Sequence, residues 1–327
     1  MRVCIFGAGA IGGYVGVSLH RLPGVDVSLV ARGAHLAAMQ ANGLRLLVGG
    51  EERVARIRCT DDPRELGPQD YVILALKAHS ITGAVDSILP LLGPETSIVT
   101  MSNGIPYWYF HEWGGALSGT KLQTIDPDGR QWRLLGPERA IGAVVFPAAE
   151  VIASGVIRHE HGRRFPIGEP SGLRTERIER LHAMLVAGGL EAPIRHDIRD
   201  EVWLKLWGNL CFNPISALTH ATVDLIATDP GTGAVCRSMM TEAAAIADRL
   251  GVRLRVDMER RISGVAALGA HKMSMLQDLE RGRAMEIGPL VGVVQEMGRL
   301  TGVPTPSIDI LLALIRQRAQ VAGQFAC

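Results

Sequence analysis

The first half of the chain alternates short apolar runs with longer stretches that have apolar residues at helical spacing. Short runs ended by glycine or polar residues predict buried strands, and the longer stretches predict helices. Strands are expected at 3–6, 26–31, 71–76, 97–101 and 141–146, and helices at 10–21 and 33–42. Two β-rich runs, 44–48 and 53–59, flank Gly49-Gly50 and predict a hairpin. This alternation predicts a mostly parallel sheet with right-handed crossovers.

The pattern changes near residue 198, after which convincing strands are absent and the periodicity becomes helical throughout. Helices are expected at 200–212, 232–250, 290–301 and 306–321. We therefore predict two domains. An α/β domain with a mostly parallel sheet covers residues 1–197, and an all-α domain covers residues 198–327.

Composition excludes several classes of protein. Among the 327 residues, 47% are hydrophobic and 20% charged, which is typical of a globular protein. The net charge is only +1, which argues against nucleic-acid binding, and no apolar run approaches the ~18 residues of a membrane span. The cysteines are scattered and odd in number, so neither a disulfide framework nor a zinc knuckle is expected. They are Cys4, Cys59, Cys211, Cys236 and Cys327. With no signal peptide before the first strand, we expect a cytoplasmic protein.

A glycine-rich loop follows the first predicted strand and opens the first predicted helix. Gly7-Ala8-Gly9-Ala10-Ile11-Gly12 matches G-x-G-x-x-G, the loop that binds a dinucleotide. The first glycine permits the turn, the second admits the pyrophosphate, and the third lets helix and strand pack closely. The helix N-terminus would then hold the phosphates. The bland alternative, a plain glycine-rich turn, is disfavoured by this βαβ context. We therefore predict a dinucleotide-binding loop at this position.

Two basic residues extend this site. An NAD enzyme usually has an acidic residue at the end of the second strand, where this chain has Arg32. A guanidinium suits the 2′-phosphate of NADP, so we predict NADPH/NADP⁺ as cofactor. Lys77 follows the third strand of the predicted sheet, at the edge where ligands bind. It is a candidate for a phosphate or substrate contact, and a solvated surface side chain is the alternative for either residue.

A polar stripe lies on the first helix of the second domain. Lys205, Asn209 and Asn213 are four residues apart and fall on one face, among tryptophan, leucine and phenylalanine. A lysine in a partly desolvated cleft can act as a proton donor to a ketone oxygen. A solvent-facing stripe is the alternative, although asparagine is a poor helix former. Asn103 follows the strand at 97–101, where it could contact a ribose, a substrate or only its own turn.

Further candidates lie near the C-terminal end. Ser274 begins the run Ser-Met-Leu-Gln-Asp, and Glu286 precedes Pro289, which suits the start of a helix. Glu286 could accept a hydrogen bond from a substrate hydroxyl, or be an ordinary acidic residue at a helix start. His159 and His161 share one face of a predicted strand, but no third ligand is evident, so no metal site is predicted.

Taken together, these motifs resemble the ketopantoate reductase (2-dehydropantoate 2-reductase) family. The matching elements are GAGAIG, Arg32, LALKAH with Lys77, SNG with Asn103, KLWGNLCFNP with Lys205, and SMLQD leading to Glu286. The resemblance implies a Rossmann domain, a helical domain and a site in the cleft between them. It also implies reduction of ketopantoate to pantoate with NADPH, on the route to pantothenate and coenzyme A.

The resemblance assigns roles to individual residues. Lys205 is implied as the general acid, and Glu286 as the residue that binds the substrate hydroxyl. Asn209, Asn213 and Ser274 are implied as substrate contacts, and Asn103 would lie near both nicotinamide and substrate. The oligomeric state stays open, with a homodimer as one option.

The chain departs from the family pattern between Gly104 and Ile141. Family members usually have a shorter, plainer segment there, whereas this chain has the aromatic run 107–113 and a strand-like run around Trp132. Because it follows Asn103, we expect the aromatic run to form part of the cleft wall. This departure from the family pattern bears more on which substrate is used than on which type of reaction is catalysed. The alternatives are a related NADPH-dependent reductase of another small 2-oxo acid and a non-catalytic NADPH-binding protein.

Overall fold

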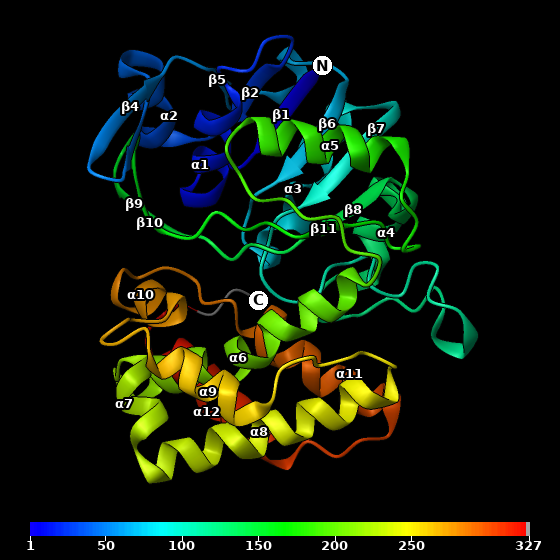
Figure 1. The fold of residues 1–327 in the computed structure, drawn as a ribbon, viewed down its shortest axis with the longest axis vertical. Helices are drawn as coiled ribbons and strands as arrows, with labels where there is room; N and C mark the ends of the chain where they lie inside the picture. Colours follow the sequence, from blue (N-terminus) through cyan, green and yellow to red (C-terminus); the bar gives the residue numbers. More distant parts are fainter. Residues whose placement is uncertain (325–327) are drawn as a thin grey trace. The chain divides into compact units, whose positions relative to one another are not determined.

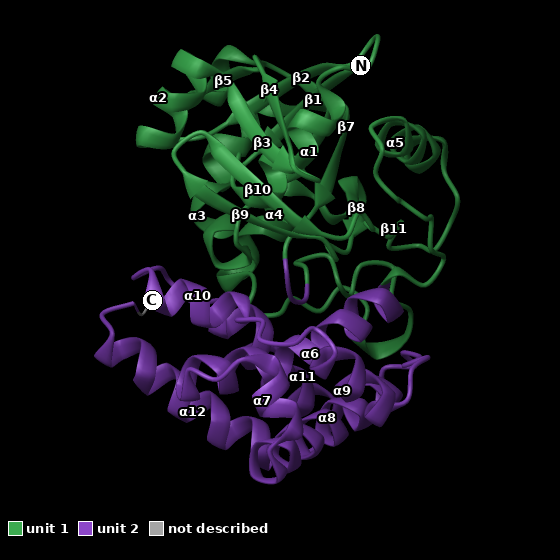
Figure 2. Ribbon diagram, turned by 60° about the vertical axis from the view of Figure 1, so that its left-hand side comes forward, with its two compact units in different colours: residues 1–102, 106–198 green, residues 103–105, 199–327 purple. Residues whose placement is uncertain are grey.

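The computed structural model describes residues 1–324, so Cys327 lies outside the described part. These residues form two compact units (Figure 2). The first contains residues 1–102 and 106–198, and the second contains residues 103–105 and the chain from Arg199 onward. The short segment 103–105 is thus separated in sequence from the rest of its unit.

The first unit is built around a sheet whose central strands are parallel. Within residues 1–324, seven strands form it in the order β11-β8-β7-β6-β1-β2-β5 (Figure 1). They are β1 (Arg2–Phe6), β2 (Asp26–Val30), β5 (Arg58–Thr60), β6 (Gln69–Leu74), β7 (Leu92–Thr100), β8 (Ala140–Ala143) and β11 (Ile167–Gly168). Neighbouring strands pair in parallel except β11, which runs antiparallel to β8. The predicted α/β class with a mostly parallel sheet is confirmed.

A second, smaller sheet was not predicted. Its order is β4-β3-β10-β9, formed by β4 (Glu51–Ala55), β3 (Leu44–Val48), β10 (Val156–His161) and β9 (Ala148–Ala153). The hairpin at Gly49-Gly50 is confirmed, since β3 and β4 pair antiparallel around it. The predicted run 53–59 is wrong as one strand, because it breaks after Ala55 and resumes as β5 in the parallel sheet.

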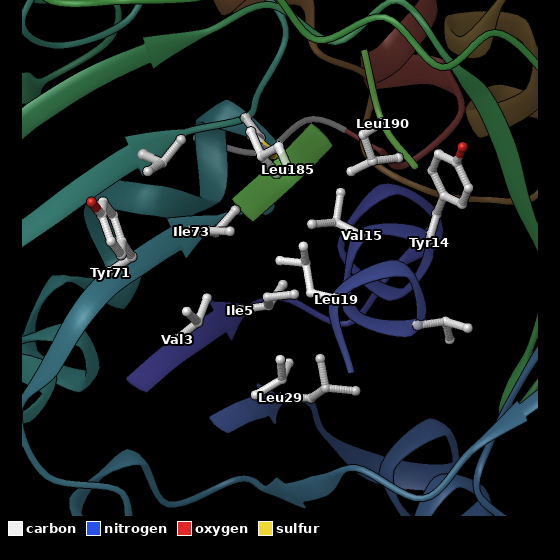
Figure 3. Packing of buried hydrophobic residues seen from close by; sticks show 14 of the residues in the cluster. Val3, Ile5, Tyr14, Val15, Leu19, Leu29, Tyr71, Ile73, Leu185 and Leu190 are labelled. Carbon is white, nitrogen blue, oxygen red and sulfur yellow. The ribbon is translucent and has the colours of Figure 1, made fainter. Parts of the chain in front are cut away.

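The first helix packs between the two sheets. In Figure 3, Val15 and Leu19 of α1 (Ala10–Leu19) face Ile5 of β1. On the other side, a Cβ at Gly13 would lie 2.0 Å from the Ile157 side chain of β10. Being covered on both sides explains why α1 is apolar around its circumference. The other helices of this unit are α2 (Gly33–Asn42), α3 (Ala78–Ile88), α4 (Arg130–Leu135) and α5 (Glu176–Ala187).

The aromatic run after residue 106 belongs to the packed interior of the first unit. Tyr107, Trp108, Tyr109 and Phe110 are all buried, and the indole nitrogen of Trp108 donates to the Thr100 hydroxyl at the end of β7. The same ring packs on Gly142 of β8, where a Cβ would lie 2.7 Å from it. The expectation that this run lines a substrate cleft is therefore wrong for these side chains. The strand-like run at Trp132 is also wrong, because that residue lies in α4.

Within the described residues, the regular secondary structure of the second unit is helical. Its elements are α6 (Ile198–Thr219), α7 (Val223–Thr228), α8 (Pro230–Arg249), α9 (Met258–Ala266), α10 (Ser274–Glu280), a π-helical turn (Gly288–Gly292), α11 (Val293–Thr301) and α12 (Pro306–Val321). The long helix α8 packs against α7, α11 and α12. Its buried residues recur at helical spacing and include Cys236, Met239, Met240, Ala243 and Ile246. No helix within residues 1–324 is long and apolar enough to cross a membrane.

Candidate active site

The glycine loop between β1 and α1 has a backbone that only glycine allows at two positions. Gly7 has a φ of +106°, and a Cβ there would lie 3.0 Å from the Ala75 carbonyl oxygen. A Cβ at Gly12 would lie 2.0 Å from the Gly7 carbonyl oxygen. In contrast, a Cβ at Gly9 would meet nothing within 4 Å, so the space above this residue is open. The loop therefore fits the phosphates of a dinucleotide at the N-terminus of α1.

A pocket opens at the carboxyl edge of the parallel sheet beside this loop. It is lined by Phe6, Gly7, Ala8, Gly9, Val30, Ala31, Arg32, His35 and Leu76. The lining contains no acidic side chain, and the exposed Arg32 stands at the end of β2 as the residue before α2. This is the position where an acidic residue would bind the ribose hydroxyls of NAD. The pocket therefore has a cationic rim where an NAD enzyme would have an anionic one.

His35 was not predicted and holds the glycine loop in place. Its Nε2 lies 2.8 Å from the carbonyl oxygen of Ala8, and its Nδ1 accepts a hydrogen bond from the Gly155 amide. With Nδ1 as the acceptor, Nε2 is the ring nitrogen that donates to Ala8. No sequence motif marks this residue, because Gly155 is 120 positions away along the chain. Lys77 is half-buried and immediately follows Leu76 of the pocket, but does not itself line it.

Helix α6 presents two opposite faces. Trp203, Trp207 and Leu210 are buried on one side, and the Trp207 indole nitrogen donates to the Met240 carbonyl of α8 at 2.7 Å. Lys205 and Asn209 lie on the other side and are only half-buried. Packing of the tryptophan face against α8 therefore turns the lysine and the amide away from the helical core.

One side-chain amide joins a lysine and a carboxylate within the second unit. The Lys205 ammonium donates to Oδ1 of Asn103 at 2.7 Å, and Nδ2 of Asn103 donates to Oε2 of Glu286 at 3.2 Å. Gly104, the residue after Asn103, lets this segment approach Pro289 closely. It has a φ of +84°, and a Cβ there would lie 2.3 Å from the Pro289 carbonyl oxygen. The glycine of the Ser-Asn-Gly motif is thus required for this close approach.

The environment of Lys205 favours release of its proton. Burial lowers the pKa of Lys205 to about 8, Glu286 opposes this shift, and the nearby Arg261 adds to it. An ammonium with this pKa is still largely protonated at neutral pH, yet can give up its proton. The pair of Lys205 and Glu286 therefore offers a proton donor beside a hydrogen-bond acceptor.

The other predicted residues of the second unit divide into two roles. Asn209 forms no side-chain hydrogen bond with any of residues 1–324. Asn213 is completely buried, and its Oδ1 accepts bonds from the Ser274 hydroxyl at 3.0 Å and the Met275 amide at 3.1 Å. Asn213 thus fixes the start of α10 and orients Ser274, a role the sequence did not predict. Its direct contact with substrate stays a prediction.

Glu286 is buried and stands just before the helical turn that leads into α11. Its carbonyl accepts a hydrogen bond from the Leu290 amide at the start of a π-helical turn, within which Pro289 lies. A π-turn is often found where a helix must present a side chain at a functional site. His159 and His161 lie in β10 as predicted, and within the described residues no group of three or more potential ligands could hold a metal ion.

Comparisons with known proteins cover nearly the whole chain. The family model described as ketopantoate reductase PanE/ApbA matches residues 3–172, and its C-terminal counterpart matches residues 197–319. A protein of Mesorhizobium japonicum named 2-dehydropantoate 2-reductase is 57% identical over 326 residues, which is 100% of both chains.

Solved structures agree with these matches. A crystal structure assigned as a ketopantoate reductase of Ralstonia solanacearum MolK2 is 42% identical, with a TM-score of 0.94 and 99% of each chain covered. A structure of D-mandelate dehydrogenase with NADH and anilino(oxo)acetate is 20% identical, with a TM-score of 0.85 over 99% of this chain and 100% of that one. The latter shares the fold alone.

Proposed function

The chain belongs to the ketopantoate reductase family, and on this premise we propose that it reduces 2-dehydropantoate to pantoate with NADPH. The observation that carries this proposal is the half-buried Lys205, held by Asn103 beside Glu286. A non-catalytic nucleotide-binding protein would have no need of a lysine with a lowered pKa in its helical unit. The product would enter the synthesis of pantothenate and coenzyme A.

Lys205 supplies the proton in this scheme. As the ketone carbon is reduced, negative charge develops on the carbonyl oxygen, and the ammonium stabilises it before donating a proton from Nζ. The C=O double bond becomes a C–OH single bond, and Lys205 is reprotonated from solvent. Asn103 orients Nζ through the 2.7 Å hydrogen bond, and Glu286 accepts a hydrogen bond from the substrate hydroxyl.

The first unit binds the dinucleotide. The Gly7–Gly12 loop receives the pyrophosphate, and Arg32 at the pocket rim receives the 2′-phosphate, which selects NADPH over NADH. Lys77 adds a second positive charge next to the pocket. When bound, the reduced nicotinamide supplies the hydride that the ketone carbon accepts.

Two further properties follow from the proposal. The four described cysteines are free thiols, which supports a cytoplasmic protein. Besides NADPH, the partner that the proposal requires is a small 2-oxo acid. A homodimer stays a prediction, which sedimentation of the purified chain would test.

The proposed activity is tested by following NADPH oxidation with 2-dehydropantoate and a panel of other small 2-oxo acids. We expect 2-dehydropantoate to have the highest kcat/KM. Lys205→Ala should lower kcat by about two decades or more while NADPH affinity stays near that of the wild type. Lys121→Ala, which removes an exposed lysine of the first unit, is the matched control. If another 2-oxo acid has the highest kcat/KM, that acid is the substrate and the assignment of 2-dehydropantoate is wrong. If no acid is turned over, the proposed reductase activity is refuted.

A further inference from the structure

Arg261 lies on the face of α6 that carries Lys205. It comes from α9, and its guanidinium packs over Gly208, where a Cβ would lie 3.2 Å from Nη2 and 3.3 Å from Nε. Gly208 is three residues after Lys205, so these two residues lie on one side of the helix. Because residue 208 has no side chain, the guanidinium of Arg261 reaches this side of α6.

Within residues 1–324, Arg261 lacks a counter-charge. Within residues 1–324, no acidic side chain pairs with Arg261, and its buried Nε has no hydrogen-bond partner. Other arginines of this unit are paired, such as Arg237 with Glu259 and Arg283 with Asp278. A partly buried cation without a partner is costly, so its presence needs an explanation.

Cys211, the described side chain that acts to raise the pKa of Arg261, does not supply the missing charge. The Cys211 thiol lies near enough to influence Arg261, but burial raises the pKa of Cys211 well above its usual range. The thiol therefore stays neutral. Burial of the guanidinium also lowers the pKa of Arg261, because few water molecules can solvate its charge. An anion that enters the site from outside would satisfy it.

Two charged side chains near Lys205 act on its pKa in opposite directions. Glu286 raises the pKa of Lys205 and Arg261 lowers it, so both lie within electrostatic reach of the ammonium. Glu286 and Arg261 do not pair with each other within the described residues. A carboxylate of the substrate would be repelled by Glu286 and attracted by Arg261. The site thus has a hydrogen-bond acceptor, a proton donor and a separate cation.

We propose that Arg261 binds the carboxylate of the 2-oxo acid substrate, an assignment that rests on the proposed function. The substrate has a hydroxyl at one end, a ketone in the middle and a carboxylate next to the ketone. Glu286 accepts from the hydroxyl, Lys205 protonates the ketone oxygen, and Arg261 pairs with the carboxylate through its planar fork. Arg261 is then a specificity determinant for acids over neutral ketones.

The test compares a charged and an uncharged substrate in matched variants. We would measure kcat and KM for 2-dehydropantoate and for its methyl ester with the wild type, Arg261→Gln, Arg261→Lys and Arg260→Gln. Arg260 is the exposed neighbour on the same helix, so its variant controls for the loss of one positive charge. Thermal unfolding of each variant confirms that it is folded.

We expect Arg261→Gln to lower kcat/KM for the acid about 10- to 100-fold, mainly through KM, because a hydrogen-bonded charge pair has this magnitude. The same variant should change kcat/KM for the ester less than about threefold, Arg261→Lys should recover part of the loss, and Arg260→Gln should match the wild type. An equal loss for acid and ester, or no loss for either, would overturn the proposal.

Failure of the proposed function is distinguishable from failure of this assignment. If the wild type reduces no 2-oxo acid, the reductase is refuted, and Arg261 is then tested by calorimetric titration with oxamate, a small 2-oxo carboxylate. Weaker oxamate binding by Arg261→Gln than by Arg260→Gln would support the carboxylate site. Equal binding by the two variants would refute it.

Discussion

The ammonium of Lys205 donates a 2.7 Å hydrogen bond to the side-chain oxygen of Asn103, a residue 102 positions earlier in the chain. The amide cannot neutralise the lysine, so it orients Nζ without removing the positive charge. The same amide donates to Glu286 through its nitrogen, which fixes which end of Asn103 faces the lysine. The proton donor therefore has a set direction before any substrate arrives.

The first prediction concerns the pH dependence of reduction. The reaction needs protonated Lys205, whose pKa is lowered to about 8, so the donor is present below this pH and lost above it. We expect kcat/KM for 2-dehydropantoate to fall tenfold per pH unit above about pH 8. Glu286 and Arg261 are the charged groups that act on this lysine, the first raising its pKa and the second lowering it. A profile that is flat to pH 10 would exclude Lys205 as the acid.

Replacing Asn103 should shift the dependence of kcat/KM on pH. Its oxygen accepts from the charged form of Lys205, so Asn103→Ala should move the alkaline limb down by roughly one pH unit. Asn103→Asp places a carboxylate beside the ammonium and should move the limb upward. If Asn103 only stabilised the fold, its replacement would lower kcat/KM at every pH without shifting the pH at which kcat/KM begins to fall. Profiles of kcat/KM for both variants therefore separate positioning from simple structural support.

Glu286 should affect binding more than chemistry. Glu286→Ala removes the acceptor for the substrate hydroxyl, which is remote from the reacting carbonyl, so KM should rise about tenfold or more with a smaller change in kcat. The variant also removes the charge that raises the pKa of Lys205, so the alkaline limb should move to lower pH. An oxo acid without a hydroxyl is the control, since its KM should change little. A kcat that falls as far as in Lys205→Ala would contradict this division of roles.

Much of the fold follows from local pattern. The alternation of apolar runs and helical stretches predicts the parallel sheet, and Gly33–Asn42 and Pro306–Val321 form the helices expected from their sequences. The second sheet could not be predicted in this way, because β3 pairs with β10 across more than a hundred residues. Such pairing is decided by tertiary packing around α1, which no local pattern records.

The candidate site likewise combines features that follow from local sequence with features that depend on distant contacts. The stripe of Lys205 and Asn209 follows from helical spacing, and the start of a helix near Glu286 follows from Pro289. The bridge through Asn103 and the approach of Arg261 to Gly208 depend on contacts between distant segments. Chemistry that lies on one element is visible in the sequence, whereas chemistry shared between elements appears only once the chain is folded.

The aromatic run shows how sequence reasoning can misplace a residue. Its position after Asn103 favoured a role in substrate binding, yet Trp108 is completely buried and bonded to Thr100. We now expect Trp108→Ala to reduce the free energy of unfolding by about 3–5 kcal/mol, as for other large buried aromatics. Denaturant unfolding would measure this loss. A stable variant with an altered KM for the oxo acid would restore the original hypothesis.

Arg32 provides the test of cofactor choice. It is exposed at the end of β2, on the rim of the pocket that also contains Gly7 and Gly9, and no acidic side chain lines this pocket. A guanidinium there gains a bidentate interaction with the 2′-phosphate of NADPH, whereas NADH offers only a hydroxyl. Arg32→Asp should weaken NADPH binding by about 10- to 100-fold and narrow or reverse the preference over NADH.

The matched control for this prediction is Arg21→Asp, which makes the same change in charge at an exposed position away from the pocket. Titration of the intrinsic fluorescence with each nucleotide gives the two dissociation constants without relying on turnover. The fold should be unaffected, because no side-chain hydrogen bond caps α2 at Arg32. If the wild type binds NADH as tightly as NADPH, or if Arg32→Asp and Arg21→Asp change the ratio equally, then Arg32 does not select the cofactor. The positive rim would in that case serve only to attract the anionic dinucleotide, an effect that should weaken as salt is raised.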